Sequence, residues 1–128
     1  MTTDPGDTRT GGDPSIAVVG PCASGKSTLA EALRARGYDA RQIVQEHSYV
    51  PDMWQQITSP DVLIYLDASF ETSTRRKSLA WQRADYEEEV RRLTHAREHC
   101  DLYLATDALS PAEVLEAVLE HISKKAQT

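Results

Sequence analysis

The sequence predicts an α/β protein, a three-layer sandwich in which helices cover both faces of a mostly parallel sheet. Short apolar runs typical of buried strands alternate with segments whose apolar residues recur at helical spacing. The first such run enters a glycine-bearing turn that leads directly into a helix. Parallel strands need crossover connections, and the alternating helices supply them. The chain of 128 residues is long enough for one core but too short for two folded domains.

Residues 1–14 are predicted to form a disordered tail, because after the initiator Met1 they contain no apolar side chain that could offset the entropy of ordering. Residues 15–128 are then one domain. It begins with a strand at 15–20, which is continuously apolar and therefore covered on both faces. A helix follows from Lys26, with Leu29 and Leu33 on one face, and it ends near Gly37.

The middle of the chain contains one weak and one strong strand. Residues 39–44 are a weaker strand candidate, and residues 45–60 are predicted to be irregular. Residues 61–67 (DVLIYLD) are a strong strand, because consecutive β-favouring side chains lie between polar ends, and we expect it to be central and buried. Asp61, at its beginning, is interpreted as a turn residue.

The C-terminal half is predicted to add three helices and a last strand. Ser69 can cap a helix that runs to Lys77, and a polar connector at 78–83 separates it from a helix with Tyr86, Val90 and Leu93 on one face. Residues 100–106 are the last strand. A final helix opens at Ser110 with a capping box and buries a stripe of apolar residues, Val114, Leu115, Val118 and Ile122.

The segment GPCASGKS, residues 20–27, matches the P-loop (Walker A) pattern of glycine, four residues, then Gly-Lys-Ser. A chance glycine turn is the alternative, but a strand before the motif and a helix after it are the context that a P-loop requires. Backbone N–H groups at such a helix N-terminus bind phosphate. The motif therefore predicts a P-loop NTPase fold that binds ATP or GTP, with a phosphate site made of Gly20, Pro21, Cys22, Ala23, Ser24, Gly25, Lys26, Ser27 and Thr28.

Two residues are candidate ligands of Mg²⁺. The Ser27 hydroxyl follows the P-loop lysine, and Asp67 ends the strong strand, where an acidic residue can approach the metal of a bound nucleotide. A strand-ending or helix-capping aspartate is an equally weighted interpretation of Asp67. Lys26 can reach the terminal phosphates and is the first catalytic candidate.

Arg75, Arg76, Lys77 and Arg83 are the only concentrated positive stretch of an acidic chain. They follow the strong strand on the side where ligands bind in open α/β sheets, so we expect at least one of them to neutralise transferring phosphate. A solvated helix face is the alternative. The later arginines Arg91, Arg92 and Arg97 alternate with glutamates and are interpreted as an exposed, salt-bridged face.

Residues 45–54 (QEHSYVPDMW) are the candidate acceptor site, because this loop is rich in hydrogen-bonding and aromatic groups. Glu46 or Asp52 could orient or deprotonate a hydroxyl, and His47 and Tyr49 could bind it. A histidine in a loop is also compatible with a surface or packing role, and His47 and Ser48 lack an acid partner for a hydrolase triad. Met53 and Trp54 are interpreted as core residues.

Composition excludes several classes of partner. A net charge of −6 and a pI near 5.1 argue against binding of nucleic acid or an anionic membrane. The two cysteines, Cys22 and Cys100, are too few for a disulfide framework and lack metal-site spacing, which favours free thiols in a reducing compartment. No apolar run approaches the roughly 20 residues that span a bilayer, and the N-terminus has no signal-peptide pattern. We therefore expect a cytoplasmic protein.

The order of strand, P-loop, helix, DVLIYLD with an Arg-Arg helix, and DLYLATD with SPAEV resembles P-loop nucleoside and nucleotide kinases, especially thymidylate-kinase-like ones, in a reduced form. The resemblance spans 16–122. It implies that Arg75, Arg76 and Arg83 match lid arginines and that residues 107–111 line the adenine. The chain departs from that family between 45 and 60, where a further strand with an Asp-Arg pair is usual and no such pair occurs.

Three functions are compatible with these features. The first is an ATP-dependent kinase that transfers the γ-phosphoryl group to a small acceptor, with Lys26, Glu46, Asp67 and the arginines 75, 76 and 83 as catalytic residues. The second is a P-loop NTPase or nucleotide-dependent switch without a small-molecule acceptor. The third is a module that binds nucleotide without turnover. The kinase is the first hypothesis.

Overall fold

The computed structural model describes residues 14–57, 59–77 and 81–126. The tail predicted at 1–14 lies outside this range except for Pro14, as do residues 78–80 of the predicted connector. Four strands, β1 (Ser15–Val19), β2 (Asp39–Gln42), β3 (Val62–Asp67) and β4 (Leu102–Ala105), form one sheet in the order β2-β1-β3-β4. All three pairings are parallel. The predicted α/β fold with a parallel sheet is confirmed.

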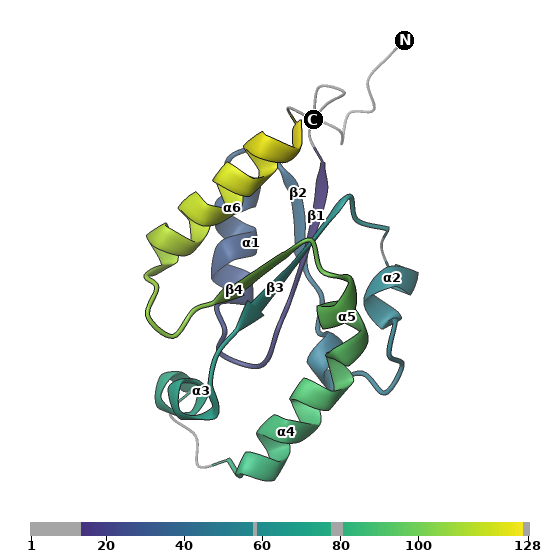
Figure 1. Ribbon diagram of the computed structural model, residues 1–128, viewed down its shortest axis with the longest axis vertical. Coiled ribbons are helices and arrows are strands. Elements are labelled where there is room, and N and C mark those ends of the chain that lie inside the picture. The colour runs from purple at the N-terminus through teal and green to yellow at the C-terminus, as the bar shows by residue number, and fades with distance from the viewer. Residues whose placement is uncertain (1–13, 58, 78–80, 127–128) are drawn as a thin grey trace.

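The sheet separates two apolar cores, because side chains alternate between its faces along each strand. Ile16 and Val18 of β1 face the first core, whereas Ala17 and Val19 face the second. Helices α1 (Lys26–Ala35) and α6 (Pro111–Ala126) cover the first core. Helices α2 (Met53–Ile57) and α5 (Thr94–His99) contribute to the second (Figure 1). The three layers are therefore those that the sequence predicts.

The central strands explain why their sequences are continuously apolar. β1 and β3 pair with each other, with Ile16 opposite Val62 and Val19 opposite Tyr65, and each also has an outer neighbour. The five residues from Val62 to Leu66 are all buried, as expected for a strand covered on both faces. The carboxyl ends of β1 and β3 lie at the same edge of the sheet, beyond which α3 (Phe70–Lys77) lies (Figure 1).

The segment predicted as irregular is more ordered than expected. It contains a 3₁₀ helix, η1 (Gln45–His47), and the short helix α2. The buried Gln45 amide holds them together, since its Nε2 donates to the Val50 carbonyl at 2.8 Å and its Oε1 accepts from the Trp54 N–H at 2.8 Å. Hydrogen bonds of one buried glutamine, rather than apolar periodicity, organise this segment.

The helix predicted around Tyr86, Val90 and Leu93 is divided into α4 (Arg83–Arg92) and α5. The division falls at Leu93, which is fully buried in the second core and accepts a hydrogen bond from the Arg97 N–H at 2.9 Å. The predicted caps are confirmed at two other helices. The Ser69 hydroxyl accepts from the Thr72 N–H at 3.1 Å, and Ser110 and Glu113 exchange side-chain to backbone hydrogen bonds of 2.8 and 3.1 Å.

Candidate functional site

The glycine-rich loop lies between β1 and α1 at the carboxyl edge of the sheet. Gly20 has φ 154°, and a Cβ there would lie 2.0 Å from the Leu66 carbonyl oxygen of β3. Gly25, the residue before α1, has φ 102°. Only glycine reaches these conformations without strain, so both glycines of the motif are required by the path of the backbone. Ala23 also has a positive φ, 64°.

The Lys26 ammonium group lies over the loop that precedes it. Its Nζ donates to the carbonyls of Gly20 and Pro21 at 2.9 and 3.1 Å. The same Nζ forms an ion pair of 3.0 Å with Glu46 Oε2, and the two side chains are only 7% and 3% exposed. Because a buried ion pair is held in one geometry by packing on all sides, Lys26 and Glu46 are fixed relative to the loop.

Hydroxyl groups line the start of α1. Ser27 and Thr28 are exposed in the first turn of the helix, where backbone N–H groups have no intrahelical partner. Ser24 is 2% exposed, and its hydroxyl finds no hydrogen-bond partner among the described residues. These groups fit a bound phosphate with its Mg²⁺, because they offer unpaired donors and oxygens at a helix N-terminus.

A cavity of about 240 Å³ adjoins the loop. Ala23 and Gly25 form one wall, and Leu109 and Pro111 form another from the β4–α6 connection. The resemblance to kinases predicts that this connection lines the adenine. Asp107 ties the connection to the start of α3, since the Ser69 N–H donates to its Oδ1 at 2.9 Å and lowers the pKa of the Asp107 carboxyl.

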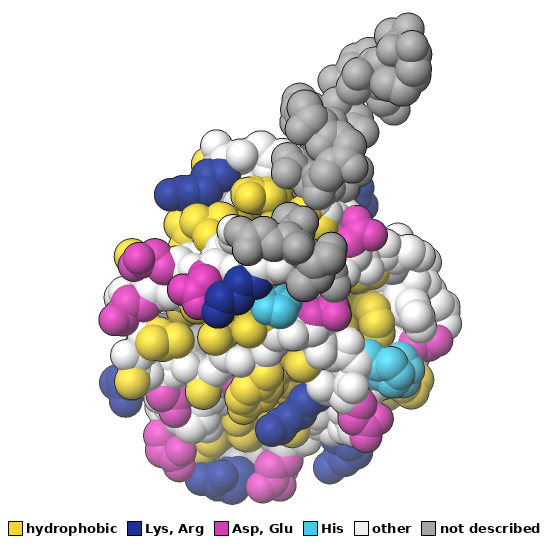
Figure 2. All heavy atoms as spheres, turned by 45° about the horizontal axis from the view of Figure 1, so that its top comes forward, with side chains coloured by type: hydrophobic (Ala, Val, Ile, Leu, Met, Phe, Trp, Pro, Cys, Tyr) yellow, Lys and Arg dark blue, Asp and Glu magenta, His cyan; other side chains and the backbone are white. Residues whose placement is uncertain are grey.

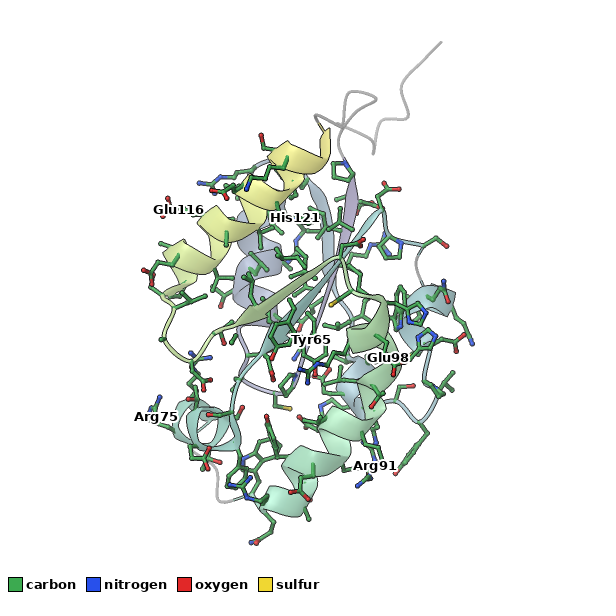
Figure 3. All side chains as sticks on the ribbon, viewed as in Figure 1. Tyr65, Arg75, Arg91, Glu98, Glu116 and His121 are labelled. Carbon is green, nitrogen blue, oxygen red and sulfur yellow. The ribbon has the colours of Figure 1, made fainter. Side chains whose placement is uncertain are left out.

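The three candidate lid arginines occupy different places. Arg76 reaches the loop, where its guanidinium donates to the Ala23 carbonyl at 3.0 Å and to the Thr106 carbonyl at 2.7 Å. Arg83 forms an ion pair of 2.8 Å with Glu71 and lies over the Phe70 ring. Arg75 points away from the body of the molecule (Figure 3). Arg76 alone of the three lines the cavity beside the loop.

Asp67 lies at the end of β3 in a cluster of tyrosines. Its carboxylate accepts hydrogen bonds from the Tyr103 hydroxyl and from the Ala68 N–H. Burial and then the hydrogen bond to Asp67 raise the pKa of Tyr103 to about 12. Burial and the neighbouring Asp67 charge likewise raise the pKa values of Tyr65, which lies in the interior in Figure 3, and Tyr86. The contacts of Asp67 are thus with tyrosine and backbone.

The candidate acceptor residues divide into buried and exposed groups. Glu46 is buried against Lys26, whereas His47 is exposed, with its Nε2 3.8 Å from Glu46 Oε2. Tyr49 is 84% exposed beneath the Arg92 guanidinium, and Asp52 accepts a hydrogen bond from Gln56 in its own helical turn. Trp54 is buried in the second core, which confirms its interpretation as a core residue, and Met53 packs against it.

Sequence reasoning missed Glu89, which it assigned to an exposed charged face. The Glu89 side chain is buried beside the loop, where its Oε1 accepts from the Cys22 N–H and its Oε2 accepts from the Cys22 thiol, both at 2.9 Å. Helical spacing carries a signal for this placement. Glu89 is three residues after Tyr86 and four before Leu93, so it shares the inward face of α4.

The arginines of the same segment behave differently from one another. Arg91 and Arg92 both form ion pairs with Glu88, as expected for a charged face. Arg97 is exposed, as expected, and its guanidinium lies over the Tyr103 ring at 4.9 Å. On the face shown in Figure 2, basic and acidic side chains are interspersed rather than segregated.

Among the helices of the described residues, none combines the length and the apolar character that a membrane span requires.

A parallel sheet, a glycine-bearing phosphate loop at its carboxyl edge and a lysine folded over that loop define a P-loop protein. The chain belongs to the AAA domain family, whose model matches residues 16–121. That match supports a nucleotide-binding kinase or NTPase of the P-loop superfamily. None of the curated proteins matches the chain.

Proposed function

We propose that the protein is an ATP-dependent phosphotransferase that transfers the γ-phosphoryl group to the hydroxyl of a small acceptor. The observation that carries this proposal is the buried pair of Lys26 and Glu46, whose charged atoms lie 3.0 Å apart at the phosphate loop. A carboxylate beside the lysine that faces the terminal phosphate is where a general base for the incoming hydroxyl is needed. Glu46 Oε1 has no hydrogen-bond partner among the described residues, so one oxygen is available for that proton.

In this proposal, residues 20–28 other than Pro21, which has no N–H group, hold the phosphates through their backbone N–H groups, and the cavity beside Leu109 and Pro111 takes the base. A bound Mg²⁺ neutralises phosphate charge, and Ser27 would hold it with Asp67 as the second candidate. The unpartnered Ser24 hydroxyl supports a ligand at this place, since a buried polar atom without a partner is costly. ATP is preferred in this proposal, with GTP as the alternative, and residues 15–128 are the domain that binds it.

Arg76 is the proposed arginine of the transfer step, because its guanidinium already lies at the loop. It stabilises the charge that spreads over the transferred phosphoryl group. Arg75 and Arg83 would have to move from their present contacts to take part. In the reaction, the acceptor hydroxyl gives its proton to Glu46 while its oxygen bonds to the γ-phosphorus, and the bond to the β-phosphate oxygen breaks to release ADP.

The proposal uses the resemblance to thymidylate-kinase-like enzymes for the nucleotide-binding part of the site and not for the acceptor-binding part. Residues 45–57 form two short helical elements in place of the acceptor region of those enzymes, and the described sheet has four strands. The acceptor is therefore proposed as a small molecule that is held against Glu46, with His47, Tyr49 and Asp52 as candidate contacts. Cys22 and Cys100 form no disulfide in the part of the chain that the structure describes, which supports a reducing compartment such as the cytoplasm.

A nucleotide-dependent switch is the second candidate. Within the described ranges, four of the five large exposed apolar side chains lie on one segment: Val44, Tyr49, Val50 and Ile57. Exposed apolar side chains on one segment suit contact with a protein partner. Under this alternative the segment 44–57 responds to the γ-phosphate through the Lys26–Glu46 pair, and no small acceptor is phosphorylated.

The test is ADP release from ATP and Mg²⁺, with and without nucleosides, nucleotides, sugars and other hydroxyl compounds. We expect one acceptor to raise the rate and to gain phosphate. Glu46→Gln should lower kcat by about 10²–10⁴-fold, because it removes the base. ATP should still bind, because Lys26 remains and the nucleotide phosphates supply the negative charge that pairs with it. Glu31→Gln, an exposed glutamate on α1, is the matched control and should leave the rate unchanged. Slow hydrolysis that no acceptor stimulates would reject the kinase in favour of the switch.

A further inference from the structure

Three side chains from separate segments converge beside the phosphate loop. They are the thiol of Cys22 in the loop, the imidazole of His47 in η1 and the carboxylate of Glu89 in α4. One ligand atom from each lies within 4.8 Å of the other two. Neither the nucleotide site nor the proposed transfer step uses this set as a whole.

Two of the distances between these ligand atoms can be compared with the distances between ligands of a tetrahedral zinc ion. Sulfur, nitrogen and oxygen ligands lie about 2.0–2.3 Å from zinc, so two ligands of a tetrahedral ion are about 3.3–3.8 Å apart. Cys22 Sγ lies 3.7 Å from His47 Nε2. Cys22 Sγ lies 2.9 Å from Glu89 Oε2, so a side-chain adjustment of less than about 1 Å opens that edge to the tetrahedral value.

The charges around the set favour an additional cation. Glu46 and Glu89 are buried carboxylates, and among the residues that the structure describes the buried Lys26 ammonium forms its ion pair with Glu46 and not with Glu89. The Arg92 guanidinium pairs with Glu88 and donates to the Glu46 carbonyl rather than to either buried carboxylate. A buried carboxylate without a full charge partner is costly, and a divalent ion would compensate for it. His47 is exposed, which gives an ion access from solvent.

We propose that Cys22, His47 and Glu89 form a zinc site with a fourth position open to water. Thiolate, imidazole and carboxylate together select zinc over magnesium, which prefers oxygen ligands only. The Cys22 thiol releases its proton to solvent when its sulfur binds the ion, and Glu89 exchanges its hydrogen bond from that thiol for the metal. The site is distinct from the proposed Mg²⁺ position, because neither Ser27 nor Asp67 is among its three ligands.

The position of this site links zinc to the phosphate loop. Glu89 Oε1 accepts the Cys22 N–H at 2.9 Å, so the carboxylate occupies one donor of the loop. The Glu46 carboxylate is close to both the phosphate loop and the proposed zinc site, because its Oε2 lies 3.0 Å from Lys26 Nζ and 3.8 Å from His47 Nε2. An ion bound here alters the charge beside the lysine that faces the nucleotide. The site is therefore a regulatory metal site rather than a structural one.

The experiment titrates the full chain with Zn²⁺ by calorimetry and with Co²⁺ by absorbance, without nucleotide. We expect one ion per chain and a sulfur-to-cobalt charge-transfer band. Cys22→Ser should abolish that band, and His47→Gln and Glu89→Gln should each weaken Zn²⁺ binding by at least about 10-fold. Cys100→Ser and His99→Gln are matched controls, since neither residue is in the set, and both should bind as the parent does.

A charge-transfer band that survives Cys22→Ser and disappears in Cys100→Ser would overturn the proposal, as would unchanged Zn²⁺ affinity in His47→Gln. Because His47 is exposed, its substitution should leave folding intact even if Glu89→Gln unfolds the chain, so this variant alone keeps the test decisive. The outcome does not depend on whether the protein is a kinase or a switch, because no nucleotide or acceptor is present.

Discussion

At the scale of single residues, the loop depends on positions where the backbone leaves no room for a side chain. Gly20 lies where β1 passes β3, and a Cβ there would lie 2.0 Å from the Leu66 carbonyl oxygen and 2.8 Å from the Ser24 hydroxyl. Gly37 also has a positive φ, 92°, but a Cβ there would meet no atom within 4 Å. A comparison of substitutions at the two glycines therefore distinguishes the effect of steric overlap from the effect of backbone strain.

Gly20→Ala is expected to destabilise the protein by about 2 kcal/mol or more, because the neighbouring atom is backbone and must move. Gly37→Ala, the matched control, should cost about 1 kcal/mol for the strained φ alone. Urea unfolding of both variants measures the difference. Equal losses in the two variants would contradict a steric role for the β1–β3 contact.

The buried pair of Lys26 and Glu46 predicts a non-additive result. Lys26→Met should destabilise the protein by about 3–5 kcal/mol, because it leaves the Glu46 charge buried without its partner. Adding Glu46→Gln should recover a large part of that loss, since the second change removes the uncompensated charge. Urea unfolding of the parent, the two single variants and the double variant measures this coupling between Lys26 and Glu46.

Nucleotide binding should respond differently to the same variants. ATP affinity is expected to be lost in Lys26→Met and to stay lost in the double variant, because the phosphates need the ammonium group itself. Calorimetric titration of the parent and both variants with ATP and Mg²⁺ measures these affinities. Unchanged ATP affinity in Lys26→Met would remove the basis of the proposed phosphate site.

At the scale of elements, η1 and α2 are held by Gln45 rather than by apolar packing alone. The Gln45 side chain is completely buried and bonds the Val50 carbonyl, the Trp54 N–H and, at 3.3 Å, the Arg92 carbonyl of α4. One side chain therefore joins the turn, α2 and α4. The candidate acceptor residues lie in the segment that it organises.

Gln45→Ala should free residues 45–57 to open locally, at a cost of about 1–3 kcal/mol for the buried groups left without partners. Faster amide hydrogen exchange confined to this segment is the expected observation. Gln55→Ala is the matched control, because Gln55 is exposed in α2. Uniform acceleration across the sheet would show instead that Gln45 supports the whole fold.

The edge of β3 and β4 predicts a loss of stability in alkali. Burial and the Asp67 hydrogen bond raise the pKa of Tyr103 to about 12 from an ordinary value of 10.0. Between these values the folded protein keeps a proton that the unfolded chain has lost. The stabilisation is therefore present below pH 10.0 and disappears as the pH rises to about 12.

Urea unfolding at several pH values in this window should show a shallower decline for Tyr103→Phe than for the parent. The decline should not vanish, because burial raises the pKa values of Tyr65 and Tyr86 as well. Tyr49→Phe is the control, since the Tyr49 ring is 84% exposed, and it should keep the parent's profile. An identical profile for Tyr103→Phe would contradict the role of the Asp67 hydrogen bond.

At the scale of the whole molecule, both cores are built from residues 16–122. Deleting residues 2–13 should therefore leave the free energy of unfolding and the ATP affinity within about 0.5 kcal/mol of the parent. Val118→Asp, which places a charge in the core between α6 and the sheet, should unfold the chain or nearly so. Urea unfolding and ATP titration of both variants check the limits of the domain. A large loss in the truncated chain would place part of the fold in its first residues.

Several elements could be predicted because their signals in the sequence are local. The P-loop pattern, the apolar runs of β1 and β3 and the caps at Ser69 and Ser110 each depend on neighbours in the chain, and short-range sterics and hydrogen bonding decide them. The parallel three-layer fold follows from their alternation. The roles of the site residues stay predictions, although the sequence placed Lys26, Glu46 and Arg76 among the candidates.

Only the tertiary structure decided the strand order and which charged groups meet at the loop. Glu89 is 67 residues from Cys22, and their contact depends on how α4 packs beside the loop. Local periodicity shows which face of α4 turns inward, but it does not show what that face meets. Arg76 and Arg83 are the same residue type in the same positively charged stretch of sequence. Arg76 nevertheless binds the loop, whereas Arg83 binds Glu71. Packing of distant elements, which no local signal encodes, separates them.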